Sequence, residues 1–180
     1  DSFLIDENGC GLDLKKILQN LLMEIHDSFS SNFRTIHKQV MLALLGLISP
    51  PDAHETRKIF KDADGVEILL PFLEHGDVEI RNTVVQMLWI MSNESMDKIC
   101  HFIMTTKKPI ILLTKLLHKG VREEVQVAAA GILSCLAMGE TNLTLELMEP
   151  NVLAMLMHHI IDGGLKLKEN AMGALLRFTL

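Results

Sequence analysis

The amino-acid sequence predicts an all-α protein built as a right-handed solenoid of about four helical repeats. The first observation behind this prediction is the composition: of 180 residues, 48% are hydrophobic but only 4% are aromatic. The apolar residues are mainly Leu, Ile, Val, Ala and Met, most of which favour helices and pack well between them. Alternating β-branched runs bounded by tight-turn dipeptides, which would predict hairpins, are absent.

The second observation is self-similarity at a spacing of a little over forty residues. Segment 69–76 is echoed by 112–120, and segment 124–133 by 166–175. One leucine recurs in each predicted long helix, with separations of 44, 45 and 42 residues; these are Leu44, Leu88, Leu133 and Leu175. Each unit alone would leave an apolar face in water, so neighbouring units are expected to stack into one continuous core.

The repeats are predicted to form a single domain over 1–180, and the first two span about 11–50 and 51–93. Their helices are expected at 12–27 and 33–48, then at 53–60, 66–74 and 78–91. Pro50 and Pro51 end the first repeat, because proline lacks the N–H group and disfavours the α conformation before it. Asp62 and Asp64 precede the helix from 66 and are expected to cap it.

The third and fourth repeats are predicted at about 94–138 and 139–180. Their helices are expected at 96–104, 109–118 and 122–137, then at 143–148, 152–161 and 165–178. Pro109 suits a helix start, and Gly76, Gly120 and the pair Gly163-Gly164 follow the middle helices, where glycine accommodates a left-handed cap. The sequence ends within an apolar helix, and we expect it to be a fragment of a longer solenoid.

Charge and cysteine content exclude several classes of function. The net charge is −6 and the pI about 5.7, which argues against sequence-independent nucleic-acid binding. No apolar run approaches the roughly 18 residues of a membrane-spanning helix. The three widely spaced cysteines predict neither a disulfide framework nor a zinc site, so we expect a reducing, cytoplasmic location, with nuclear or membrane-peripheral placement as alternatives.

The sequence offers no catalytic or metal-binding constellation and predicts no cofactor. Cys100 and His101 are adjacent on a helix and point about 100° apart, so they cannot share an activating proton. His158 and His159 lack the i,i+3 or i,i+4 spacing of helical metal ligands and are expected at a wet helix end. No glycine-rich phosphate loop follows a strand. We therefore expect no enzymatic activity from this chain.

Two of the long helices carry a family pattern of small and apolar residues. Segments 129–137 and 171–179 both follow it, and in these residues the chain resembles the armadillo repeat family, a resemblance that covers nearly the whole sequence. More narrowly, segments 78–82 and 169–179 are similar to the C-terminal armadillo region of plant U-box ubiquitin ligases, although no U-box is present. The resemblance implies a binding scaffold with a concave groove lined by the third helix of each repeat.

The armadillo family holds extended peptides on a ladder of Asn and Trp side chains along this groove. The Asn position falls on Gly46, Ile90, Cys135 and Arg177 in this sequence, and the Trp position falls on Leu42, Gln86, Gly131 and Gly173. None of these positions carries the Asn or Trp of the family pattern. Without Asn amides there are no paired bonds to a peptide main chain, and without Trp there is no stack for cationic side chains. Peptide binding as in nuclear-import receptors and catenins is therefore not expected.

The predicted groove instead presents a mixed surface. Its candidate binding residues are Lys38, Leu42, Asn82, Gln86, Trp89, Ile90, Gly131, Glu169, Gly173 and Arg177. Trp89 is expected either to anchor a partner or to pack against the adjoining repeat. Gly131 and Gly173 either allow tight packing between helices or let a partner helix approach the backbone.

The leading functional hypothesis is a protein–protein interaction module that recruits a partner through the third-helix groove. By resemblance, it would be the substrate-recruiting part of a U-box ubiquitin ligase. Alternatives are a membrane-peripheral or chaperone-linked armadillo regulator, or a purely structural scaffold segment. The acidic charge makes binding to anionic membranes unfavourable, and no nucleic-acid partner is expected.

Overall fold

The computed structural model describes residues 14–28, 34–106, 108–136 and 150–178, and this part of the chain is helical without strands. The helices are α1 (Leu14–Ser28), α2 (Arg34–Ile48), α3 (His54–Asp62), α4 (Gly65–Leu69), the 3-10 helix η1 (Leu70–Glu74), α5 (Val78–Thr106), α6 (Lys108–Lys115), α7 (Glu123–Leu136), α9 (Pro150–Asp162) and α10 (Leu165–Phe178). The all-α prediction is confirmed. The helix predicted at 143–148 lies outside the described residues.

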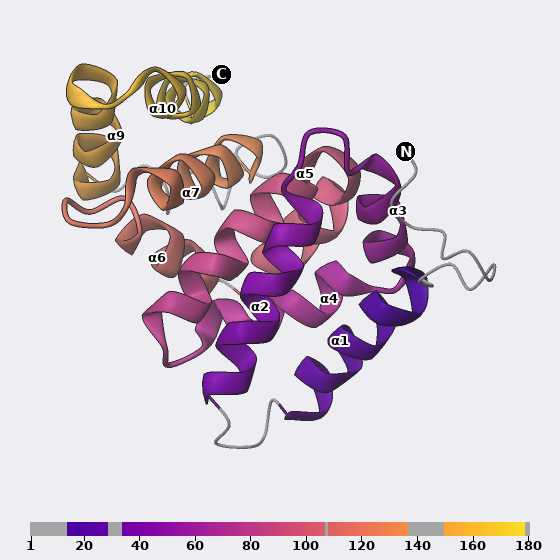
Figure 1. Cartoon of the computed structure of the whole chain (residues 1–180). Coiled ribbons are helices and arrows are strands. Elements are labelled where there is room, and N and C mark those ends of the chain that lie inside the picture. The colour runs from indigo at the N-terminus through magenta and orange to yellow at the C-terminus, as the bar shows by residue number, and fades with distance from the viewer. Residues whose placement is uncertain (1–13, 29–33, 107, 137–149, 179–180) are drawn as a thin grey trace.

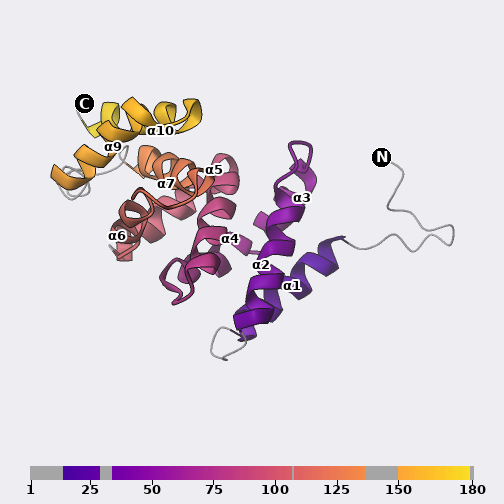
Figure 2. The ribbon, with the colours of Figure 1, turned by 60° about the vertical axis from the view of Figure 1, so that its left-hand side comes forward.

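The helices follow one another through a stack of repeats. Helices α1–α3 lie at one end of the molecule and α9 and α10 at the other (Figures 1 and 2). The third helices of successive repeats are α2, the first half of α5, α7 and α10, and each packs on the one before it: α5 on α2, α7 on α5 and α10 on α7. We call the surface formed by these four helices the third-helix face.

Helix α5 joins two helices that the sequence analysis separates. It runs from Val78 to Thr106, and Ser95 departs from helical geometry with φ −144° and ψ 22°. This kink lies between the predicted helices 78–91 and 96–104, so the third helix of the second repeat passes into the first helix of the third repeat without a loop. Without Gly or Pro at this junction, the sequence gives no strong stop signal.

A buried arginine holds the turn between the first two repeats. Arg57 is 7% exposed, and it donates hydrogen bonds from Nη1 to the carbonyl oxygens of Ile48 and Pro50, both at 2.9 Å, and from Nη2 to Pro51 at 3.2 Å. The last carbonyls of a helix have no partner within the helix. Arg57 therefore satisfies the buried Ile48 carbonyl at the end of α2 and adds a donor to the carbonyls of the proline pair.

The predicted helix caps are correct only in part. Asp64 does precede α4, but it adopts a left-handed conformation with φ 54° and makes no capping bond through its side chain. The neighbouring Gly65 is required sterically, since a Cβ there would lie 2.6 Å from the Phe60 ring. Among the described glycines only Gly120 has the positive φ expected of a left-handed cap, at 95°.

The recurring leucines lie in one continuous core. Leu44, Leu88 and Leu133 are fully buried, and Leu175 is half-buried against the core. Complete burial of such a side chain contributes about 1.5–3 kcal/mol to folding. Because these positions are one repeat apart, the buried leucines recur along the stack within the core that neighbouring repeats share.

Some large apolar side chains on the last helices remain exposed. On α10, Leu165 is 77% exposed, Leu176 is 61% and Met172 is 51%. None of the described helices combines the length and the apolar character needed to cross a membrane.

Candidate functional site

The third-helix face brings the predicted groove residues onto successive helices but does not expose them equally. Lys38 and Leu42 lie on α2 and are exposed, with Leu42 at 49%. On α5, Gln86 and Ile90 are half-buried. Glu169 on α10 is exposed, and its carboxylate lies 3.4 Å from the Lys166 ammonium group. Among the apolar residues predicted for the groove, Leu42 is therefore the most accessible to solvent.

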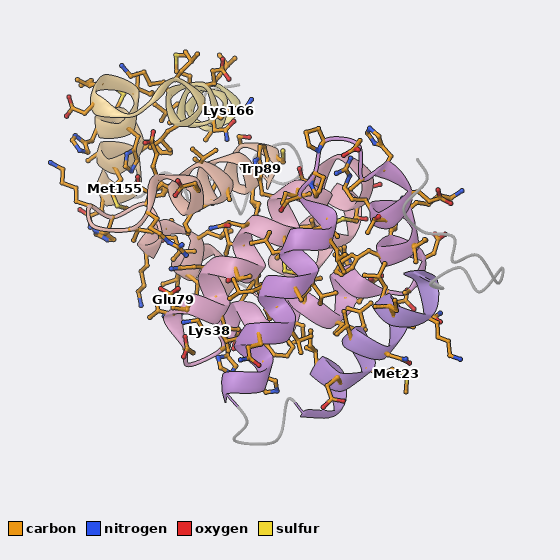
Figure 3. All side chains as sticks on the ribbon, in the orientation of Figure 1. Met23, Lys38, Glu79, Trp89, Met155 and Lys166 are labelled. Carbon is orange, nitrogen blue, oxygen red and sulfur yellow. The ribbon has the colours of Figure 1, made fainter. Side chains whose placement is uncertain are left out.

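Trp89 and Gly131 form a contact between α5 and α7. Trp89 is half-buried and lies where these helices meet (Figure 3). A Cβ atom on Gly131 would lie only 2.5 Å from the indole Cη2 and Cζ3 atoms. Gly131 itself is buried. In this structure, therefore, the absence of a side chain at Gly131 makes room for Trp89 rather than opening the backbone to a partner.

Asn82 differs from the surface position expected for it. It is only 6% exposed, and its Oδ1 atom has no hydrogen-bond donor among the described residues. A buried amide oxygen without a donor costs free energy. Asn82 therefore belongs to the packed side of α5 and not to the polar border of a groove.

The remaining predicted residues lie on α10. Gly173 is half-buried, and a Cβ atom there would lie 3.6 Å from the Ser134 Cβ atom, an ordinary contact distance. Gly173 is therefore not required by close packing. Arg177 belongs to α10, and its side chain lies outside the described part of the structure.

A charge interaction links Lys38 on α2 to Asp77, which directly precedes α5. The Asp77 carboxylate accepts a hydrogen bond from the Glu79 backbone N–H at 2.8 Å and a longer one, 3.4 Å, from Ile80. These bonds, chiefly the one from Glu79, lower the pKa of Asp77 below its usual value, and the positive charge of Lys38 acts in the same direction. Lys38 therefore interacts with the neighbouring third helix as well as with solvent.

Several residues that join the repeats are missed by the sequence analysis. Asn170 Nδ2 donates to the Val127 carbonyl at 2.9 Å. His159 was expected at a wet helix end, but it is 5% exposed, and its Nε2 atom lies 2.6 Å from the Leu117 carbonyl oxygen. That prediction is wrong for His159. The sequence shows only that bonded partners such as Asn170 and Val127 lie about one repeat apart. This spacing does not reveal which atoms come within hydrogen-bond distance.

A metal-binding site is not evident on the described surface. Among the residues that the structure describes, no group of three or more His, Cys, Asp and Glu side chains is placed to hold a metal ion. The third-helix face consists instead of apolar, amide and charged side chains suited to contact with another molecule.

Comparison with protein-family models and with curated proteins finds no match. Solved structures do match. An engineered protein is 25% identical with a TM-score of 0.59, over 92% of this chain and 62% of that chain. A designed armadillo repeat protein is 18% identical with a TM-score of 0.60, over 89% of this chain and 63% of that one.

A further designed armadillo repeat protein, solved in complex with the peptide (KR)4, is 20% identical. Its TM-score is 0.58, and the match covers 91% of this chain and 64% of that chain. The fold is an armadillo-type α-solenoid. This chain spans a little over three fifths of the length of these three structures. The small rotation from one repeat to the next in such a solenoid creates an extended surface of the kind that repeat proteins use for binding.

Proposed function

We propose that this chain is a protein-recruiting module whose partner binds along the third-helix face. The observation that carries the proposal is an armadillo-type stack whose third helices present partly exposed apolar side chains, chiefly Leu42 and Trp89. Large aromatic and apolar side chains at the centre of a polar surface are frequent anchors of protein interfaces. A designed armadillo neighbour that binds a peptide supports a protein partner.

The side chains of this face favour recognition of a partner's side chains over recognition of its main chain. Two ladder positions of the family carry the apolar residues Leu42 and Ile90, whose side chains offer no hydrogen bond to an extended peptide backbone. At the third repeat, the indole of Trp89 covers Gly131. A partner that presents apolar side chains to this face fits this arrangement.

The finer proposal is that the module recruits substrates or partners for a U-box ubiquitin ligase. It rests on the similarity of segments 78–82 and 169–179 to the armadillo region of plant U-box ligases. A cytoplasmic location follows from the same proposal. In such a ligase the U-box recruits the ubiquitin-conjugating enzyme, and the solenoid supplies only the choice of substrate.

The experiment is an affinity capture with two matched variants, read by mass spectrometry. Leu42→Asp places a charge on the third-helix face, whereas Met23→Asp makes the same kind of change at a 61% exposed site on α1. A partner retained by the native chain and by Met23→Asp but lost by Leu42→Asp supports the proposal. Both variants must first show native helicity and melting. Equal partner lists for all three proteins would contradict it.

The ubiquitin-ligase role has its own test. The chain alone, mixed with E1, E2, ubiquitin and ATP, is expected to form no ubiquitin conjugates, while fusion to a U-box is expected to direct conjugation to the captured partner. Conjugation by the unfused chain, or a fusion that ignores the partner, would contradict the ligase proposal without affecting the binding proposal.

A further inference from the structure

A polar pocket lies at the junction of the third and fourth repeats, which we call the 3/4 seam. Its volume is about 280 Å³, it opens to solvent, and it is lined by the turn between α6 and α7 and the turn between α9 and α10. None of the predicted groove residues lines it. The pocket is therefore separate from the third-helix face.

The junction one repeat earlier, the 2/3 seam, shows which group the pocket lacks. Glu79 and Glu123 are 44 positions apart, at the starts of α5 and α7. At the 2/3 seam, the Glu79 carboxylate lies 3.8 Å from Nη2 of Arg122, 43 residues further along the chain. At the 3/4 seam, Glu123 instead accepts a hydrogen bond at 3.0 Å from the backbone N–H of Gly164, 41 residues further along. A guanidinium group at one seam is thus replaced by glycine at the next.

The chain has no cation at this position, because residue 164 is glycine. The Glu123 carboxylate lies in the space that a Cβ atom there would take. A second basic side chain is also replaced. In the second repeat, Arg81 donates a hydrogen bond to the His75 carbonyl. In the third repeat, the neutral Gln126 makes the corresponding bond to the His118 carbonyl, at 2.9 Å. Two guanidinium groups near the 2/3 seam therefore have no counterparts among the residues that line the 3/4 pocket.

Two nearly buried side chains that line this pocket, Gln126 and His159, offer further acceptor atoms. Gln126 is 8% exposed; its Nε2 atom donates to the His118 carbonyl, which leaves Oε1 as the acceptor of the amide. His159 is 5% exposed, and because Nε2 donates to the Leu117 carbonyl, Nδ1 presents a lone pair. The carboxylates of Glu123 and Asp162 line the same pocket.

From this geometry we infer that the 3/4 pocket receives an arginine side chain from a partner protein. A guanidinium group is planar and carries five N–H donors without an acceptor, which matches two carboxylates and two neutral acceptors around one space. The lining also contains Lys119 and His158, but Lys119 is exposed and His158 Nδ1 lies 2.9 Å from Asp162 Oδ2, at the rim. The arginine of the partner would take the place that Arg122 takes beside Glu79.

The test is a titration of the whole chain with N-acetyl-arginine-N-methylamide, followed by two-dimensional NMR. The expected result is a saturable shift of the Gly163 and Gly164 backbone amide signals and of the Gln126 side-chain amide. The citrulline analogue, which has the same shape without charge, is expected to produce no saturable shift. Glu123→Gln keeps an oxygen for the Gly164 N–H but removes the charge, and should weaken binding about tenfold, the loss expected for one charge-assisted bond.

Glu124→Gln is the matched control, because Glu124 is exposed, adjacent and outside the pocket lining; it should leave the affinity unchanged. If Glu123→Gln does not fold, Asp162→Asn replaces it with the same expected direction. The inference is overturned if the arginine probe produces no saturable shift, if citrulline binds equally well, or if Glu124→Gln weakens binding as much as the pocket variant does.

Discussion

The indole ring of Trp89 occupies the space that a side chain at Gly131 would fill, with only 2.5 Å between the ring and the position of a Cβ atom. Two features that are far apart in the sequence, one tryptophan and one mid-helix glycine, are therefore parts of a single contact between α5 and α7. Gly131 costs its helix about 1 kcal/mol relative to alanine, and the ring of Trp89 packed against it offsets this cost.

Gly131→Ala is expected to destabilise the protein by about 1–3 kcal/mol, because the added methyl group displaces a packed aromatic ring. Gly173→Ala is the control: a Cβ there meets Ser134 at 3.6 Å, so helix propensity should stabilise it by up to about 1 kcal/mol. Urea denaturation measures both changes. Equal effects of the two substitutions would contradict the packing argument, and Trp89→Leu should reduce the penalty of Gly131→Ala.

His159→Ala should destabilise the protein by about 1–3 kcal/mol, since it leaves the buried Leu117 carbonyl without its donor. The adjacent His158→Ala removes a half-buried ring that interacts with the exposed Asp162, and it should change stability by no more than about 0.5–1 kcal/mol. Thermal melting of the two variants compares neighbouring positions of the same residue type. A larger loss for His158→Ala would show that the bond to Leu117 does not join the repeats.

Arg57→Ala should destabilise the protein by about 1–3 kcal/mol, because it removes the buried hydrogen bond to the Ile48 carbonyl at the end of α2. Hydrogen exchange should rise most strongly in α2 and α3. Lys58→Ala, at the next and exposed position, should remain within about 0.5 kcal/mol of the native protein. Uniformly increased exchange in all repeats would argue against a local capping role for Arg57.

The lowered pKa of Asp77 predicts that the stability of the folded protein depends on pH. Its pKa in the folded protein lies below the unfolded value because the ionised carboxylate accepts the Glu79 N–H and lies near Lys38. The stability that it contributes is therefore fully present above the unfolded pKa, and it is lost as the pH falls through the folded pKa. Asp77→Asn should lack this contribution.

The measurement is the urea midpoint of native protein and Asp77→Asn between pH 5 and about pH 2. The native protein should be the more stable at pH 5, and the difference should shrink on acidification. A difference that stays constant or grows would show that the charge of Asp77 is not what stabilises the start of α5. Glu124→Gln serves as a control for loss of an exposed negative charge near a helix start.

The helices that the structure describes were predictable to within a few residues because their signals are local. Pro50-Pro51 ends α2, and the spacing of Leu44, Leu88 and Leu133 places fully buried side chains one repeat apart. The kink at Ser95 was not predictable as a feature of one long helix, since the junction between α5's two halves carries neither Gly nor Pro.

The candidate site was less predictable than the fold. Periodicity places Asn82 and Gln86 on the same helix face, but the structure buries Asn82 and leaves Gln86 partly exposed. Which of them reaches solvent depends on how α5 packs against the helices of neighbouring repeats, and that packing cannot be read from one helix. The bond from His159 to Leu117 and the pairing of Glu123 with Gly164 are hidden for the same reason.

The sequence by itself determined the fold class, the repeat length, the helix order and the leucines of the core. Each of these follows from interactions within about one turn or from the regular recurrence of apolar residues. The tertiary structure alone decided that Trp89 covers Gly131, that His159 is buried, and that Glu123 faces a glycine where Glu79 faces an arginine. These contacts join residues about forty positions apart, and they depend on the rotation and translation from one repeat to the next, which local propensity does not specify.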